Sequence, residues 1–322
     1  MKKLLLIILS TILIFNCFLG CGESTDTIYV YTPDGAPAIS LTPAMNKNFK
    51  NVKFNVVDSQ TIGAYVTGEE LKADISVLPI NMASNLLGNG ENYKLLGTVT
   101  HGNFYLLSKS TNVITKDNLT DLVGLTIGVL QLKNIPGLTF KSVLLENDID
   151  YGEIQSPDDA KANQVNLMGI TGAEIGASDF DAFLVPSPQA DLKAKALNLN
   201  FIASLQDLYG ENGFPQAVIV AKKSLIDSNA KFISEFKNAL LDSDNFICES
   251  NIESICNFIS NSLQDGLTPT FTAKNLTYQM IVNSSIKFVE SKGCKNEIVN
   301  FITRIQKVDG NSVKTLNDNF FY

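Results

Sequence analysis

The chain has 322 residues, of which 45% are hydrophobic and 18% charged, a balance that excludes a disordered or collagen-like chain and allows a large core. Its 25 basic and 33 acidic residues give a net charge of −8, which argues against a nucleic-acid partner. His101 is the single histidine and Arg304 the single arginine. Mechanisms that need two histidines, or an arginine clamp outside the C-terminal region, are therefore excluded.

The N-terminal segment is predicted to be a secretory signal peptide, residues 1–20. Two lysines precede an apolar run at residues 4–20, which is shorter than the roughly 20 residues that a transmembrane helix needs. The sequence FLGC, which ends at Cys21, resembles a bacterial lipobox and predicts lipidation, such as palmitate, on that cysteine. A plain membrane anchor is the alternative. Residues 21–26 are expected to form a lipidated tether.

Short β-rich runs alternate with longer segments in the first part of the mature chain. Strands are expected at residues 27–32, 52–58 and 73–80, with helices between them at 36–49 and 61–71. This alternation is typical of βαβ units and a parallel sheet.

A second α/β unit is expected to begin near Asn112. Further strands are expected at residues 93–108, where Gly102 interrupts the pattern, and at 125–130, 180–185 and 213–222, with a helical stretch at 138–147. From Leu225 onward the pattern is mostly helical. The sequence therefore predicts two α/β lobes around a cleft, with residues 27–111 and 211–322 in lobe 1 and residues 112–210 in lobe 2.

Three loops after expected strands are candidate ligand contacts. In open α/β sheets, ligands bind beyond the carboxyl ends of strands and at helix N-termini, where backbone N–H groups are free. The loops are TPDGAPA at 32–38, LPINMAS at 78–84 and QLKNIPGLTF at 131–140.

Three cysteines besides Cys21, namely Cys248, Cys256 and Cys294, lie in the C-terminal third. One disulfide with one thiol left over is compatible with an extracytoplasmic location, and so are buried free thiols. Because no CxxC pair and no second histidine are present, we expect no metal site and no cofactor.

Five motifs occur in an order that resembles a known family. They are YTPDGAPA, ADISVLPIN, GNGENYKLLGTVTHGNFYLLS, GLTIGVLQLKNIPGLTFKSVL and DFDAFLVPSPQA, followed by a terminal FFY. Behind the lipobox-like leader, they resemble the solute-binding lipoproteins of ABC importers in the SsuA/TauA/THI5-like group. The resemblance covers nearly all of the mature chain. It implies an α/β type II periplasmic-binding-protein fold, in which two lobes joined by two crossover segments close on a small molecule and deliver it to a membrane permease.

The resemblance also implies which residues line the cleft: Asp34, Gly35, Ala36, Asn81, Thr100, His101, Asn103, Asn134, Gly137, Leu138, Thr139 and Pro186. The Asp34 carboxylate either accepts a hydrogen bond from a ligand amine or amide, or only caps a turn. His101 is expected to be a hydrogen-bonded cleft residue, since no Ser or Cys with a triad motif accompanies it.

The position of the single arginine limits the chemical class of the expected ligand. Bidentate guanidinium groups commonly hold carboxylates and phosphates, and Arg304 lies far along the chain from every candidate loop. A neutral heteroaromatic ligand such as an aminopyrimidine is therefore favoured, and a sulfonate held by helix N-terminal amides, with Lys133, is the alternative.

The main hypothesis is a non-catalytic, monomeric binding lipoprotein on the outer side of the cell membrane, with a small molecule and an ABC permease as partners and no nucleic acid. An enzyme on the same fold, related to a pyrimidine-synthesising enzyme and to thiaminase, is disfavoured because the distal cysteines lie away from the cleft loops. A lipoprotein that senses a ligand is the other alternative.

Overall fold

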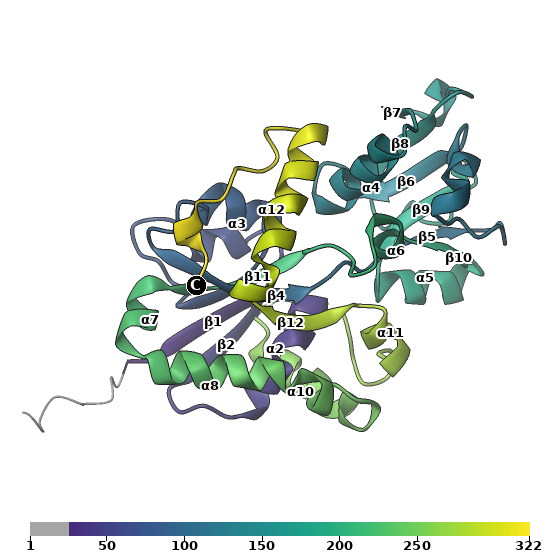
Figure 1. Ribbon diagram of the computed structural model, residues 1–322. Coiled ribbons are helices and arrows are strands. Elements are labelled where there is room, and N and C mark those ends of the chain that lie inside the picture. Colours follow the sequence, from purple (N-terminus) through teal and green to yellow (C-terminus); the bar gives the residue numbers. More distant parts are fainter. Residues whose placement is uncertain (1–25) are drawn as a thin grey trace, which may run out of the picture.

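The computed structural model describes residues 26–322, so the predicted signal peptide, the lipidation site Cys21 and nearly all of the tether lie outside the described residues. Within residues 26–322, no helix has the length and apolar character needed to cross a bilayer. This part of the chain forms two α/β lobes that lie side by side, each built on a six-stranded sheet (Figure 1).

The sheet of the first lobe has the strand order β12-β4-β11-β3-β1-β2. Its strands are β1 (Ile28–Pro33), β2 (Val52–Val57), β3 (Ile75–Pro79), β4 (Tyr93–Thr100), β11 (Ala217–Lys222) and β12 (Ile286–Glu290). β1 is parallel to β2 and β3, whereas β11 is antiparallel to both β3 and β4. Strands β1, β3 and β4 therefore end at the same edge of the sheet.

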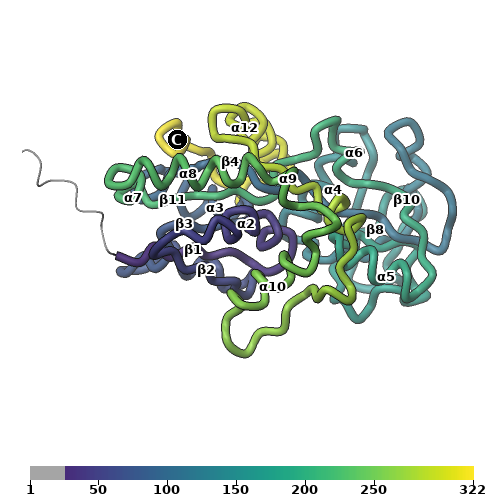
Figure 2. The backbone as a smooth tube through the Cα atoms, turned by 90° about the horizontal axis from the view of Figure 1, so that it is seen from below, coloured from purple at the N-terminus to yellow at the C-terminus, as the bar shows by residue number. Residues whose placement is uncertain are grey.

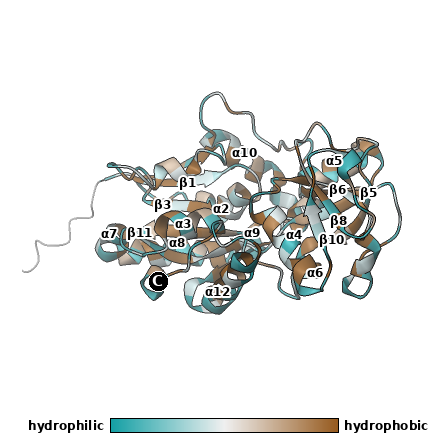
Figure 3. Cartoon of the chain, turned by 90° about the horizontal axis from the view of Figure 1, so that it is seen from above, coloured by the Kyte–Doolittle hydropathy of each residue, from teal (hydrophilic) through white to brown (hydrophobic). Residues whose placement is uncertain are grey.

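Helices cover both faces of this sheet. One face carries α2 (Ala36–Asn46), α8 (Ala230–Leu241) and α10 (Ile252–Ser262), and the other carries α3 (Ile80–Leu87) and α12 (Ser291–Val308). The shorter elements are η1 (Ile62–Tyr65), α7 (Lys223–Ser228), α9 (Ser243–Phe246), η4 (Glu249–Asn251), α11 (Tyr278–Val282) and η5 (Asp318–Phe320). Apolar residues occupy the strands and the inner faces of the helices (Figure 3), as burial of apolar surface requires.

The sheet of the second lobe has the strand order β10-β5-β9-β6-β8-β7. Its elements are β5 (Phe104–Ser108), η2 (Lys116–Leu122), β6 (Thr126–Leu130), α4 (Ile135–Glu146), β7 (Tyr151–Glu153), η3 (Pro157–Asp159), β8 (Val165–Ile170), β9 (Ala182–Pro186), α5 (Gln189–Leu197), β10 (Asn200–Ser204) and α6 (Leu205–Tyr209). β6 is parallel to β8 and β9, and β5 runs antiparallel to β9. β6 and β9 therefore end where β5 begins.

The sheet pairing corrects the predicted position of one strand. β5 was expected in lobe 1, which was predicted to extend to residue 111, yet β5 pairs with β9 and β10 in the second sheet. β4 ends at Thr100, and the chain turns away from the first sheet at Gly102, which has a φ of 89°. The other lobe limits stay predictions.

Local structure also departs from the sequence pattern in two places. The helix expected at residues 61–71 is only the single turn η1, because this stretch contains two glycines and four β-branched residues, which favour helices poorly. β12 lies in the part expected to be mostly helical, and it forms because it pairs with β4.

The three cysteines of the described chain are free thiols. Cys248 precedes η4 and is half-buried, whereas Cys256 lies in α10 and is buried. Burial raises the pKa of the Cys256 thiol, and it raises the pKa of Cys294 to about 11.

Candidate functional site

Two chain segments cross between the lobes, residues 101–103 and 210–216. The first leaves the end of β4 and enters β5, whose Phe104 lies opposite Pro186 at the end of β9. Because β1, β3 and β4 end at one edge, and β6 and β9 end where β5 begins, the carboxyl edges of both sheets meet at this crossing. Ligands of open α/β proteins bind at such edges, so this is the candidate site.

Both crossing segments require a glycine. Gly102 and Gly213 have φ values of 89° and 69°, which favour glycine. A Cβ at Gly102 would come within 2.7 Å of the Phe214 ring, and one at Gly213 within 2.1 Å of the His101 carbonyl oxygen. The two segments therefore pack directly against each other.

The loop after β1 places Asp34, Gly35 and Ala36 at this edge. Asp34 Oδ1 accepts a hydrogen bond from the Gly35 N–H (2.7 Å), and its Oδ2 accepts one from the Thr270 N–H (2.7 Å). Gly35 precedes α2 with a φ of 97°, and Ala36 is buried at the first helical position. The Asp34 carboxylate thus already holds two backbone donors, one of them from a distant loop. Thr270 was not anticipated from the sequence.

Thr100 and His101 end the first sheet at the crossing. Both are buried, and within the described chain Thr100 Oγ1 has no hydrogen-bond partner. His101 Nε2 lies 3.1 Å from both Thr98 Oγ1 and the Lys287 carbonyl oxygen, and His101 Nδ1 lies 3.8 Å from Glu297 Oε1. The imidazole thus has hydrogen-bond partners at Nε2, whereas Glu297 Oε1, the atom near Nδ1, has no hydrogen-bond partner among the described residues.

Asn103 joins the crossing to the loop after β9. Its Nδ2 donates to the Ser187 carbonyl (2.7 Å), and the Ser187 N–H donates to the Asn103 carbonyl (2.7 Å). The adjacent Pro186 is thereby brought beside Asn103. The side-chain oxygen, Asn103 Oδ1, is buried and has no partner among residues 26–322.

Gln216 is a further residue of the crossing with a side-chain oxygen that lacks a partner, and the sequence analysis did not identify it. Its N–H donates to the Thr100 carbonyl (3.1 Å), and its own carbonyl accepts from the N–H of Ile80, which precedes Asn81 in α3. Gln216 Oε1 is a further buried oxygen without a partner in the described chain. The only sequence signal was a polar residue directly before the apolar β11.

The start of α4 carries the predicted contacts of the second lobe. Asn134 is exposed and precedes the helix without capping it through its side chain, whereas Gly137, Leu138 and Thr139 are buried. Thr139 Oγ1 also lacks a partner among the described residues. A Cβ at Gly137 would come within 2.1 Å of the Leu132 carbonyl oxygen. The helix therefore starts in close contact with the preceding turn.

Arg304, which was set aside as a ligand contact, and Lys133, which was considered for a sulfonate, each have an acidic partner. Arg304 forms an ion pair with Glu146, and its guanidinium carbon lies 3.6 Å from the centre of the Tyr209 ring. Lys133 forms an ion pair with Glu153. Neither pair includes a predicted cleft residue.

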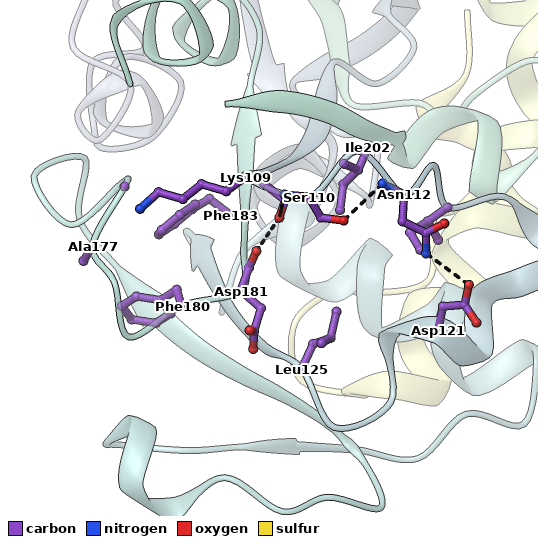
Figure 4. A pocket seen from close by; sticks show the side chains of 13 residues that line it. Lys109, Ser110, Asn112, Asp121, Leu125, Ala177, Phe180, Asp181, Phe183 and Ile202 are labelled. Carbon is purple, nitrogen blue, oxygen red and sulfur yellow. Dashed lines mark hydrogen bonds between the residues drawn. The ribbon is translucent and has the colours of Figure 1, made fainter. Parts of the chain in front are cut away.

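Two pockets lie away from this edge. One of about 390 Å³ lies where β5 ends and β9 begins, and Phe180, Phe183 and Lys109 line it (Figure 4). Ser108 Oγ donates to the Asp181 carbonyl there (2.6 Å). The other, of about 350 Å³, lies between α3 and the C-terminal segment. None of the predicted cleft residues lines either pocket.

No protein-family model and no curated protein matches the sequence. Solved structures do match it. An ABC transporter protein from Parabacteroides distasonis is 19% identical, with 92% of this chain and 98% of that chain covered and a TM-score of 0.67. The periplasmic aliphatic sulphonate-binding protein SsuA from Escherichia coli is 11% identical (93% and 92% covered, TM-score 0.63). The ligand-binding component of an ABC-type import system from Staphylococcus aureus, with zinc bound, is 12% identical (92% and 96% covered, TM-score 0.57). The expected fold is thereby confirmed: the chain has the two-lobed α/β fold of ABC-type substrate-binding proteins.

Proposed function

We propose that this chain is an extracytoplasmic solute-binding lipoprotein that captures a small molecule between its lobes and delivers it to an ABC importer permease. The observation that carries the proposal is the set of buried oxygens without partners at the carboxyl edges of the two sheets: Thr100 Oγ1, Asn103 Oδ1 and Gln216 Oε1. An unsatisfied buried polar group costs about 1–3 kcal/mol. A ligand in the cleft offers these atoms partners, and binding needs no reactive residue.

The chemistry of these atoms favours a neutral ligand that bears N–H donors, such as an aminopyrimidine. Asn103 Oδ1 is a carbonyl acceptor whose orientation is fixed, because its Nδ2 already donates to Ser187. Gln216 Oε1 offers a second acceptor. The sulfonate alternative loses the help of Lys133, which is paired with Glu153. In this proposal the N–H groups of the ligand donate to Asn103 Oδ1 and Gln216 Oε1. Asp34 is not the acceptor, because its carboxylate already accepts two backbone N–H groups.

Thermal-shift screening tests this ligand class. We expect pyrimidine compounds to raise the melting temperature and sulfonates to leave it unchanged. Gln216→Met should weaken binding of the best compound about tenfold without lowering the stability of the free protein, since it removes an amide whose buried oxygen has no partner in the described chain. Gln155→Met, on an exposed residue between β7 and η3, is the control. Stabilisation by sulfonates alone, or turnover of thiamine by the purified protein, would contradict the proposal.

Membrane attachment through the N-terminus is part of the same proposal. Cleavage after residue 20 leaves Cys21 as the lipidated first residue, with residues 21–26 as the tether. We expect the chain to incorporate labelled palmitate in its host and to fractionate with membranes, and Cys21→Ser to abolish both. Cys248→Ser is the matched control, since this half-buried thiol lies in the folded part. Membrane fractionation of Cys21→Ser at the parent level would support the plain anchor instead.

A further inference from the structure

The lobes touch on two sides of the crossing that differ in chemistry. On one side, α12 of the first lobe packs against α4 of the second. Ten consecutive residues of α4, Ile135–Leu144, are buried. A helix that is buried all round needs cover on every face, and here the second sheet covers one face and α12 another. The two helices lie side by side where the lobes meet (Figure 1).

Aromatic contacts extend this side to α6. The Phe301 ring of α12 stacks on Phe214 of the crossing segment, with centroids 5.8 Å apart and planes inclined by 10°. The Tyr209 ring lies 5.8 Å from Phe301 and 5.5 Å from Phe214. Arg304 covers Tyr209 and pairs with Glu146 at the end of α4. We call the contact of α12 with α4 and α6 the apolar seam.

The contact on the other side is mainly polar. Asn283, which follows α11 in the first lobe, donates through Nδ2 to Asp191 Oδ1 of α5 (2.7 Å). The Tyr105 hydroxyl of β5 donates to the Asn283 carbonyl (3.0 Å). Burial, and then the nearby Asp191 charge, raise the pKa of Tyr105, so its hydroxyl stays a donor. Leu192 adds one half-buried apolar contact. We call Asn283, Asp191 and Tyr105 the polar latch.

The two contacts differ in what separation costs. Opening the seam exposes the apolar faces of α4 and α12 to water, and nothing replaces the buried contacts. Opening the latch exchanges two hydrogen bonds, one of them to a carboxylate, for bonds with water, which costs about 1–3 kcal/mol. We propose that the lobes open by rotation about the apolar seam and that the polar latch breaks, so that the latch sets the balance between the open and closed cleft. Its role in ligand exchange rests on the proposed binding function.

Small-angle X-ray scattering of the ligand-free full chain tests this. We expect Asp191→Ala and Asn283→Ala each to increase the radius of gyration, and the double variant to increase it no further, because both remove the same contact. We expect Arg304→Ala, in the seam, to lower the melting temperature and leave the radius unchanged. Asp179→Ala, on an exposed aspartate of the second lobe, is the control.

Amide hydrogen exchange provides a second readout. Loss of the latch should speed exchange in residues 279–285 roughly tenfold, and the Arg304 variant should not. An unchanged radius in both latch variants, or an equal increase in Arg304→Ala, would overturn the proposal. Both readouts are taken without ligand. Failure to bind pyrimidines would therefore contradict the proposed function, but the effect of the latch variants on the radius of gyration and on hydrogen exchange would still test the opening motion.

Discussion

Gly137→Ala is expected to destabilise the protein by about 3 kcal/mol and to abolish ligand capture. The new Cβ would lie 2.1 Å from the Leu132 carbonyl oxygen and 2.5 Å from its carbonyl carbon. These are backbone atoms, so no side-chain rotation relieves the overlap. The turn before α4, in which Gln131 already has a φ of 58°, must move, and the start of the helix moves with it. Urea unfolding measures the stability, and thermal shift measures binding.

Gly210→Ala is the matched control for this substitution. Gly210 is the first residue of the second crossing segment, its φ of 172° is ordinary extended backbone, and nothing lies within 4 Å of a Cβ placed there. We expect its stability to stay within about 0.5 kcal/mol of the parent. If the urea midpoint of Gly137→Ala equals that of the parent, the result would contradict the close contact between α4 and the preceding turn.

Glu153→Gln is the second substitution with a large expected effect. Glu153 Oε1 lies 2.5 Å from Nζ of Lys141, whose side chain is only 4% exposed, and Oε2 pairs with Lys133, whose side chain is 77% exposed. Removal of the carboxylate leaves a buried ammonium group without a counter-charge, which we expect to cost about 3 kcal/mol. Lys133→Ala, the exposed half of the same cluster, should cost less than about 1 kcal/mol. Urea unfolding at neutral pH compares the two.

The same carboxylate gives a pH dependence of defined sign. Burial raises the pKa of Glu153, but the hydrogen bonds from Lys133 and Lys141 lower it by more, so the pKa lies below its ordinary 4.5. Its stabilisation is therefore complete above about pH 4.5 and is lost as the pH falls through the lower folded value. The stability difference between the parent and Glu153→Gln should shrink over that range. A difference that is constant with pH would show that the ion pair does not carry the effect.

A variant without either charge separates packing from electrostatics. Lys141→Met together with Glu153→Gln removes the buried cation and keeps an unbranched side chain in its place, so we expect it to recover most of the stability lost by Glu153→Gln alone. A double variant as unstable as the single one would mean that the loss comes from repacking around residue 153.

The sequence predicts best those strands whose burial is local. Residues 125–130 and 180–185 are apolar runs that match β6 and β9 closely, because buried parallel strands show nearly continuous apolar sequence. β12 gives no such signal, since only Phe288 is buried in it and its existence depends on pairing with β4. The sheet to which β5 belongs depends likewise on contacts that are distant in sequence, namely its pairing with β9 and β10.

The candidate site shows the same limit. The motif around Asp34 fits a turn cap and a ligand acceptor equally well, and the choice depends on Thr270, which lies 236 residues further along the chain. No local sequence pattern indicates a contact between residues so far apart in the chain. Gln216 and Asn283 were missed for the same reason, because each acts through partners in other elements. The loop positions at the strand ends were accessible because the topology of parallel sheets fixes them.

The direction of β1 has a geometric consequence for a chain anchored at Cys21, as proposed. β1 starts at the edge of the first lobe far from the second lobe and runs toward the crossing (Figure 2). A six-residue tether spans at most about 20 Å when fully extended. The lipid would thus hold the outer end of the first lobe close to the bilayer and the second lobe on the side away from it. Docking of the cleft on a permease would then require the whole protein to reorient on its short tether.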